Sequence, residues 1–285
     1  MKANYLSLAF IALVFFGCQE VGPKVDIDGT SSLLGDTTYL ETSIATPQPK
    51  VVVIEEFTGV RCVNCPRAHA TIKTIQEAHP GRVAAVGIHT GIFAQPYEGR
   101  QDFQLRPEGN DIESFLGNAQ GYPSGAVDRE LFTGESRIII NDTKWSNYVN
   151  SQLTIATPVN IELVKVFNPV SRKFDINATF KFTSAVAQDL FFTAYLCEDN
   201  IREYQLTPTG IDSNYTHNHV LRKVITPVNG QRLNAPSFIP GRVIVQRFSF
   251  VIPESWNASN LKLVGLVHGA GDNKGALHGA YTRIE

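Results

Sequence analysis

The sequence of 285 residues has no cluster of basic residues, no internal repeat and no low-complexity tract. Its lysines and arginines are scattered and its formal net charge is -2, which excludes an electrostatic surface for binding nucleic acid. It also lacks an apolar run of the roughly 20 residues that a transmembrane helix needs. The remaining composition, 43% hydrophobic and 18% charged, is typical of a globular protein. A chain of this length suits about two domains, each with its own core.

The first segment combines Lys2, an apolar stretch over residues 8–16 and the pair Gly17–Cys18. This order predicts a secretory signal peptide over residues 1–17, because the apolar stretch is too short to cross a bilayer. The residues before Cys18 resemble a bacterial lipobox, in which the signal is cut before a cysteine that carries the lipid. The resemblance implies that Cys18 is lipidated, that the lipid bilayer is a partner and that the protein is anchored in the cell envelope. The alternative is a plain secretory signal with an incidental Cys18.

If Cys18 carries lipid, three of the four cysteines remain, namely Cys62, Cys65 and Cys197. Outside the cytoplasm a close cysteine pair can persist as a disulfide. Cys197 stands in an apolar run and is most simply a buried core thiol. A structural zinc site requires four ligands, so Cys62 and Cys65 with His69 form only a minor alternative. No cofactor and no metal are therefore expected.

Residues 18–50 are polar and broken by glycine and proline. This composition predicts a tether that holds the folded part of the chain away from a membrane surface. A short strand over residues 38–44 is weakly indicated within it.

Residues 51–155 have the pattern of an α/β domain. The opening segment VVVIEEF is rich in β-branched residues, as a strand buried on both faces requires. Helical spacing follows the cysteine pair, and an apolar run over residues 83–88 completes a strand–helix–strand unit with parallel strands. Further along, GYPSGAVDR predicts a short strand and residues 141–153 predict a helix.

Residues 156–285 consist of β-rich runs separated by glycine, proline and asparagine, which predicts an all-β sandwich. The expected fold class is therefore an α/β domain followed by an all-β sandwich domain. Within the second domain, His217 and His219 would point to one face of a strand. A structural role is favoured over a metal site there, because no third ligand is evident.

Cys62 and Cys65 stand between the first strand and the helix, in the C-x-x-C arrangement of thiol–disulfide proteins. A thiolate at a helix N-terminus is stabilised by unpaired backbone N–H groups and by the helix dipole, and Arg61 adds a positive charge. We therefore expect Cys62 to be exposed and to attack, and Cys65 to resolve the mixed disulfide. Pro66 suits the first helical turn, and it excludes covalent haem attachment, which needs histidine there.

The order of strand, cysteine pair, helix, strand and a later Tyr-Pro pair resembles the thioredoxin fold. The resemblance implies a thioredoxin-like domain over residues 51–155, in which Pro123 is a cis-proline that faces the cysteines. It also implies that Glu56, six residues before Cys62, is a buried acid that relays protons. The two residues between the cysteines depart from the pattern of that family, so the resemblance defines neither the redox potential nor the partner.

Three stretches, EEFTGVRCVNCPRAH, GYPSGAVDR and YTHNHVLR, together resemble the twenty-eight-kilodalton outer-membrane-protein family of bacterial surface lipoproteins. This resemblance implies an outer-membrane location and a lipid anchor more than a particular chemistry. Two functions stay open. In the first, Cys62 and Cys65 exchange disulfides with a protein partner, Glu56 moves the proton and Pro123 shapes the docking groove. In the second, the pair is an inert staple and the protein binds a surface or envelope partner.

Overall fold

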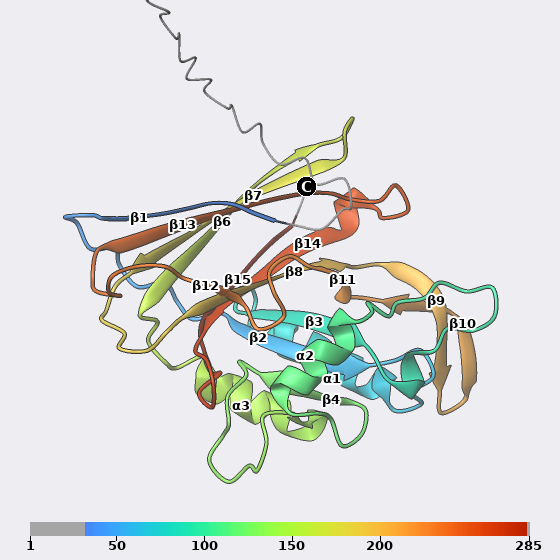
Figure 1. Cartoon of the computed structure of the whole chain (residues 1–285). Coiled ribbons are helices and arrows are strands. Elements are labelled where there is room, and N and C mark those ends of the chain that lie inside the picture. Colours follow the sequence, from blue (N-terminus) through green and yellow to red (C-terminus); the bar gives the residue numbers. More distant parts are fainter. Residues whose placement is uncertain (1–31, 284–285) are drawn as a thin grey trace, which may run out of the picture.

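The computed structural model describes residues 32–283 (Figure 1). The expected signal peptide over residues 1–17 and the expected lipid site Cys18 lie outside this part of the chain. Among the helices of the described residues, none is long and apolar enough to cross a membrane. The described chain is a mixed α/β structure with one mixed sheet, one antiparallel sheet and a separate two-stranded hairpin.

The larger sheet has nine strands in the order β15-β14-β8-β11-β3-β2-β4-β5, with β12 paired to β8. Strand β3 runs parallel to both β2 and β11, whereas the other neighbours are antiparallel. The sheet is therefore mixed. Its strands are β2 (Val52–Thr58), β3 (Val83–His89), β4 (Ser124–Val127), β5 (Ile140–Asn141), β8 (Phe191–Glu198), β11 (Val220–Val224), β12 (Gln231–Arg232), β14 (Leu261–His268) and β15 (Ala276–Arg283).

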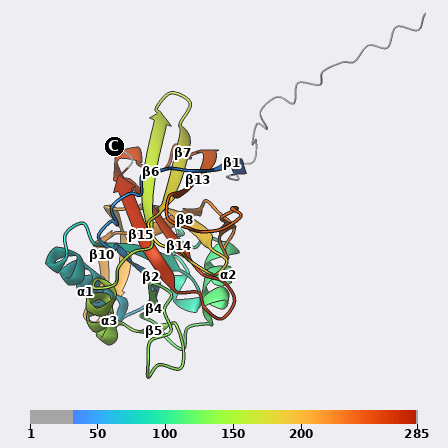
Figure 2. The same ribbon diagram turned by 90° about the vertical axis from the view of Figure 1, so that its left-hand side faces the viewer.

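The smaller sheet is antiparallel, and it lies at the opposite end of the molecule from the helices in both ribbon views (Figures 1 and 2). Its order is β1-β13-β7-β6. The hairpin of β9 and β10 pairs with neither sheet. The bounds of these strands are β1 (Ser32–Leu40), β6 (Val159–Asn168), β7 (Lys173–Phe182), β9 (Ile201–Thr207), β10 (Gly210–His217) and β13 (Arg242–Val251).

The helices cover the β2–β4 end of the larger sheet (Figure 1). Pro66 lies in the first turn of α1, where its missing N–H costs nothing. The helix expected over residues 141–153 begins as the 3₁₀ turn η2, where the Asn141 side chain accepts a hydrogen bond from Thr143 N, and α-helical structure begins only at Trp145. The helical segments are α1 (Cys65–Ala78), α2 (Glu108–Leu116), α3 (Trp145–Gln152) and the 3₁₀ turns η1 (Ile92–Ala94), η2 (Asp142–Lys144) and η3 (Ala258–Asn260).

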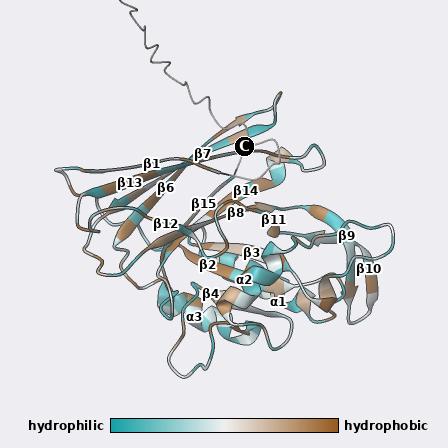
Figure 3. Cartoon of the chain, in the orientation of Figure 1, coloured by the Kyte–Doolittle hydropathy of each residue, from teal (hydrophilic) through white to brown (hydrophobic). Residues whose placement is uncertain are grey.

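Strand β2 is buried along its whole length, because both of its faces are covered. Val52 and Ile54 pack with Ala68 of α1, whereas Val53 and Phe57 belong to the core on the opposite face. A third core lies between the two sheets, and Figure 3 shows hydrophobic residues along their strands. The largest buried side chains of that core are phenylalanines, among them Phe174, Phe180, Phe182, Phe192 and Phe248.

Two features differ from the expected division into a tether and two separate domains. Residues 32–40, inside the expected tether, form β1 and pair with β13 along its length. Strand β11 pairs with β3 through Val220 and Gly87, so strands of residues 156–285 extend the sheet begun by residues 51–155. Alternation in a sequence shows which face of a strand is buried but not which strand lies beside it. The joined sheet therefore could not be read from the pattern.

Candidate functional site

The predicted cysteine pair forms a disulfide at the start of α1. The Cys62–Cys65 bond is 2.06 Å long and the two Cα atoms are 5.4 Å apart. Two backbone hydrogen bonds close the loop, from Cys62 N to the Gly59 carbonyl (3.0 Å) and from Cys65 N to the Cys62 carbonyl (3.2 Å). In this state the two sulfur atoms are bonded to each other and are not available as zinc ligands. Nor do residues 32–283 contain a group of three or more His, Cys, Asp or Glu side chains that could hold a metal ion.

Both cysteines are buried. Cys62 is 3% exposed and Cys65 is 0% exposed, so the expectation that Cys62 presents an exposed sulfur is wrong. Part of the cover is the hairpin of β9 and β10. The side-chain amide of Gln205 on β9 donates to the carbonyl oxygens of Cys62 at 3.0 Å and Gly59 at 3.3 Å. This contact ties the hairpin to the backbone of the cysteine loop.

The loop around η1 covers another side of the cysteine loop. Arg61 N donates to the Phe93 carbonyl at 2.8 Å, and a Cβ on Gly59 would overlap the same carbonyl oxygen, so only glycine permits the approach. The Arg61 guanidinium donates to two carbonyl oxygens of this loop, both at 2.9 Å, and lies 4.2 Å from the centre of the Tyr97 ring. Arg61 thus fixes the loop, which differs from its expected action on a cysteine thiolate.

Glu56 is 2% exposed and lies on the face of β2 that packs against α1, two residues after Ile54. Its Oε1 atom has no hydrogen-bond partner within the described residues, although His69 Nε2 lies 3.4 Å away. Burial, followed by the charge of Asp142, raises the pKa of Glu56 well above its usual range. The side chain therefore keeps its proton at pH values where an ordinary glutamate is ionised.

His69 connects Glu56 to the hairpin. Its Nε2 atom lies 3.0 Å from Thr58 Oγ1, and its Nδ1 atom lies 2.8 Å from the Tyr215 hydroxyl of β10. Burial lowers the pKa of His69 to about 3, with smaller contributions from two neighbouring histidines. The imidazole is consequently neutral at pH 7.

The sequence indicates that His69 belongs near the cysteines, but it does not indicate this for Tyr215. His69 stands four residues after Cys65, so the two share a face of α1. Tyr215 carries no such sign, because it lies 146 residues further along the chain than His69. It joins the site only because the hairpin folds over the cysteine loop.

A cleft of about 550 Å³ lies between α1 and residues of β10 and the loop that follows it. Glu56, His69 and Tyr215 line one part of this cleft, and Asp199, His219 and Arg283 line another. The cleft can therefore hold water or a small molecule next to the buried side chain of Glu56. Its remaining lining residues are Pro66, Ala70, Ile72, Lys73, Gln76, Asn200, Thr216 and Asn218.

The Tyr122–Pro123 peptide bond is cis, as the resemblance to the thioredoxin fold implies. Strand β4 begins at the next residue, and Ser124 lies opposite Phe57 of β2, so Pro123 stands near the point where β2 runs into the cysteine loop. Pro123 lines a separate cavity of about 440 Å³. The Tyr122 ring lies 5.7 Å from the Phe93 ring, which connects this cavity wall to the loop over the disulfide.

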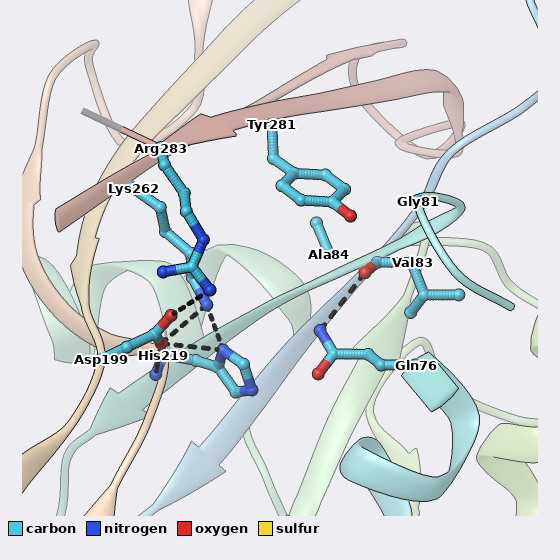
Figure 4. A pocket seen from close by; sticks show the side chains of 9 residues that line it. All are labelled: Gln76, Gly81, Val83, Ala84, Asp199, His219, Lys262, Tyr281 and Arg283. Atoms are coloured by element: carbon cyan, nitrogen blue, oxygen red, sulfur yellow. Dashed lines mark hydrogen bonds and ion pairs between the residues drawn. The ribbon is translucent and has the colours of Figure 1, made fainter. Parts of the chain in front are cut away.

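His217 and His219 take part in different clusters and do not act as a pair. His217 is buried at the end of β10, whereas His219 follows it with a φ of 61°. His219 Nδ1 contacts Lys262 Nζ and lies 3.2 Å from Asp199 Oδ1. Lys262 and Arg283 also pair with Asp199, at 2.8 and 4.0 Å, beside a cavity of about 210 Å³ (Figure 4). These contacts make His219 part of a polar cluster around the buried Asp199 carboxylate.

Comparison with known proteins gives one family and a shared fold. The model of the family described as Outer membrane protein Omp28 matches residues 115–279. The structure of HBP35 of Porphyromonas gingivalis is similar with a TM-score of 0.65 and 19% identity, covering 83% of this chain and 76% of that chain. The crystal structure of a protein from Agrobacterium tumefaciens gives a TM-score of 0.51 and 12% identity, over 84% of this chain and 96% of that one. No curated protein matches the sequence significantly. Identities this low show a common fold alone.

Proposed function

The chain belongs to the Omp28 family of outer membrane proteins, whose model spans more than half of its 285 residues, and we propose that it is a lipid-anchored envelope protein that exchanges disulfides through Cys62 and Cys65. In this proposal Cys18 carries the lipid. Residues 51–155 form a thioredoxin-like unit, and residues 156–285 form a β-sandwich that shares a sheet with it. Pro123 shapes the surface on which the partner docks.

The position of Glu56 carries the exchange proposal. This acid is buried on the face of β2 toward the helix that begins at Cys65, and its pKa is raised by burial. A neutral carboxyl group there can give a proton to a thiolate that leaves the disulfide. A disulfide that only staples a loop has no use for such a group. Buried acids with raised pKa values gather at functional sites.

The exchange balances in atoms and electrons. A thiolate of the partner protein attacks Cys62, the S–S bond breaks, and Cys65 leaves as a thiolate that takes the proton of Glu56. A second partner thiolate then attacks the mixed disulfide, which creates the partner disulfide and releases Cys62 as a thiolate that is protonated in turn. The partner loses two electrons and the Cys62–Cys65 disulfide gains them.

Burial of both sulfur atoms favours a second function. The hairpin of β9 and β10 holds the Cys62 carbonyl through Gln205, and Cys65 is 0% exposed. If this cover never opens, the disulfide is a permanent staple. The protein then acts as a non-enzymatic lipoprotein that binds a surface or envelope partner.

Trapping of partners separates the two functions. Exchange is reversible, so in Cys65→Ala the free Cys62 thiolate can attack a disulfide of the partner, and the mixed disulfide then has no resolving thiol. Covalent complexes with partner proteins should therefore accumulate in this variant. They should be absent from Cys62→Ala, and Cys197→Ala, whose free thiol is buried, should form no more of them than wild type. If Cys65→Ala captures nothing and the purified protein does not exchange with a model dithiol, the staple function is the better account.

The anchor has its own test. Cys18→Ala should lose label from a radioactive fatty acid and leave the membrane fraction, while export continues because the apolar signal stretch is intact. Unchanged lipid labelling of this variant would contradict the anchor.

A further inference from the structure

A path of polar side chains joins three elements that are distant in the sequence. Glu56 lies on β2, His69 on α1 and Tyr215 on β10. Glu56 Oε1 is 3.4 Å from His69 Nε2, and His69 Nδ1 is 2.8 Å from the Tyr215 hydroxyl. All three side chains line the cleft of about 550 Å³. The Glu56 side chain is 3% exposed and that of His69 is 22% exposed, so His69 is the more accessible of the two.

We propose that His69 is a positioning residue for disulfide exchange, which returns a proton from the cleft to Glu56 after Glu56 has protonated the leaving thiolate, while Tyr215 fixes the imidazole ring. This role rests on the proposed function. It assigns Tyr215, from the C-terminal half of the chain, to the site at the cysteines.

The role requires one of the two tautomers that the hydrogen bonds of His69 allow. In it the Tyr215 hydroxyl donates to Nδ1 of His69 at 2.8 Å, and the ring carries its proton on Nε2. Burial raises the pKa of Tyr215 to about 12, which keeps the hydroxyl protonated and able to donate. In this tautomer the Nε2 proton is directed at rest to Thr58 Oγ1 at 3.0 Å, with Glu56 Oε1 close by.

The proton transfer balances without any change of electrons. Once Glu56 has given its proton to the cysteine thiolate, its carboxylate accepts the Nε2 proton of His69 while Nδ1 takes the proton of the Tyr215 hydroxyl, so the imidazole stays neutral. Tyr215 regains its proton from solvent water in the cleft. Proton exchange of His69 with that water restores the resting tautomer. One solvent proton has then reached Glu56.

The electrostatic surroundings keep this path uncharged at rest. Burial raises the pKa of Glu56 and of Tyr215 and lowers that of His69, so all three are neutral in the same pH range. Neighbouring carboxylates and histidines shift the three pKa values in the same directions as burial does. The groups that face the path are Asp142, which is paired with Arg67 at 3.0 Å, the histidines His217 and His219, and Asp212 of β10.

The unpaired oxygen of Glu56 distinguishes this role from a purely structural one. An N–H···O hydrogen bond has a donor–acceptor distance of about 2.7–3.2 Å, and the 3.4 Å between His69 Nε2 and Glu56 Oε1 exceeds it. A structural histidine would satisfy the buried acceptor at all times. In the proposed relay this contact shortens when Glu56 ionises, which is the state in which Glu56 needs a proton.

The test compares one reduction with many turnovers in the full-length protein solubilised in detergent. In His69→Gln the side chain stays neutral and can still bond to Thr58 and Tyr215, but it cannot pass a proton. A single reduction of the disulfide by dithiothreitol should stay within about twofold of wild type, because Glu56 starts with its proton. Turnover of insulin reduction should fall about a hundredfold, the lower end of what general acid–base groups contribute, and the deficit should grow as the pH rises.

Two variants keep the test decisive. Tyr215→Phe should lower turnover in the same direction by a smaller factor, and His79→Gln, at the other end of α1, should match wild type. Wild-type turnover of His69→Gln across the pH range would overturn the relay, as would an equal loss in single reduction and in turnover. A wild-type protein that dithiothreitol reduces but that never turns over insulin would instead contradict the proposed function itself.

Discussion

Two neighbouring glutamates of β2 have opposite surroundings. Glu55 and Glu56 are 0% and 2% exposed, but successive side chains of a strand point to opposite faces. Arg129 donates to both carboxyl oxygens of Glu55 at 2.9 and 2.8 Å, and the Tyr195 hydroxyl donates to one of them at 2.6 Å. Glu56 faces α1, where its Oε1 atom has no hydrogen-bond partner within the described residues. The same residue type is thus fully paired on one face and left short of partners on the other.

This difference separates an acid that holds the fold from one that is available for chemistry. The remaining Arg129 nitrogen donates to Thr193 at 3.3 Å and to His268 at 3.0 Å, so the Glu55 network is closed. Buried polar groups are almost always paired, and an unpaired one calls for a reason. For Glu56, with its raised pKa and its place beside the cleft, we propose that the reason is proton transfer.

The largest effect is expected on the Glu55 side. Arg129→Met removes the cation and leaves Glu55 buried without its main partner, so the free energy of unfolding should fall by about 3–5 kcal/mol in urea denaturation. Arg232→Met is the matched control, since Arg232 pairs with Asp189 at 2.8 Å on the exposed surface, and it should lose less than about 1 kcal/mol. Equal losses in the two variants would remove the distinction between the two networks.

The next effect is a pH dependence that belongs to Glu56. Because its pKa is raised in the folded state, the folded protein holds a proton that the unfolded chain has lost, and stability falls as the pH rises above the usual value of 4.5. The slope is at most about 1.4 kcal/mol per pH unit for one proton. Glu56→Gln should remove this decline and be the more stable protein at about pH 8.

The difference in unfolding free energy between wild type and Glu56→Gln removes the contribution of the histidines to the pH dependence, because both proteins contain them. Those with lowered pKa values, such as His69, act in the opposite direction below pH 6.5, because there the unfolded chain binds the extra proton. Glu77→Gln is the control, because Glu77 lies on the exposed face of α1, the helix that carries His69. It should leave the slope of stability against pH unchanged. Parallel pH curves for wild type and Glu56→Gln would show that Glu56 is ionised in the fold like any other glutamate.

The smallest expected effect concerns the cover over the disulfide. Gln205→Ala removes the amide that holds the carbonyl oxygens of Gly59 and Cys62, which should favour opening of the hairpin by about 1 kcal/mol. Reduction by dithiothreitol should accelerate roughly fivefold. Arg202→Gln, on the same strand but bonded to Asn214 at the surface, should reduce at the wild-type rate. No acceleration in Gln205→Ala would mean that the hairpin does not control access.

Local features of the site could be predicted from the sequence. The β-branched run at residues 51–57 corresponds to β2 at Val52–Thr58, and the expected strand at residues 83–88 corresponds to β3 at Val83–His89. The cis bond before Pro123 is implied only by the resemblance to the thioredoxin fold. The cysteine pair and the start of α1, by contrast, follow from short-range patterns. These features succeed because each is fixed by residues within a few positions of one another.

Non-local features could not be predicted in the same way. The hairpin that brings Gln205 and Tyr215 to the cysteine loop is far away in the sequence. Its residues are mostly exposed or half-buried, so they form no apolar pattern that would indicate a packing partner. The same limit applies to Arg129. The pattern GYPSGAVDR indicates that a strand ends near this residue, but it does not indicate that Arg129 donates a hydrogen bond to Glu55. Exposure of Cys62 was expected from its place before the helix, and only the folded hairpin shows it to be buried.

The reduction potential of the Cys62–Cys65 pair tests the central claim most directly. Equilibration of the purified protein with glutathione or dithiothreitol buffers, followed by alkylation and mass measurement, gives this value. An exchanging pair should lie between about -270 and -120 mV, the range of thiol–disulfide proteins. A potential below about -300 mV, typical of structural disulfides, would contradict the proposed exchange and leave the pair as a staple under the hairpin.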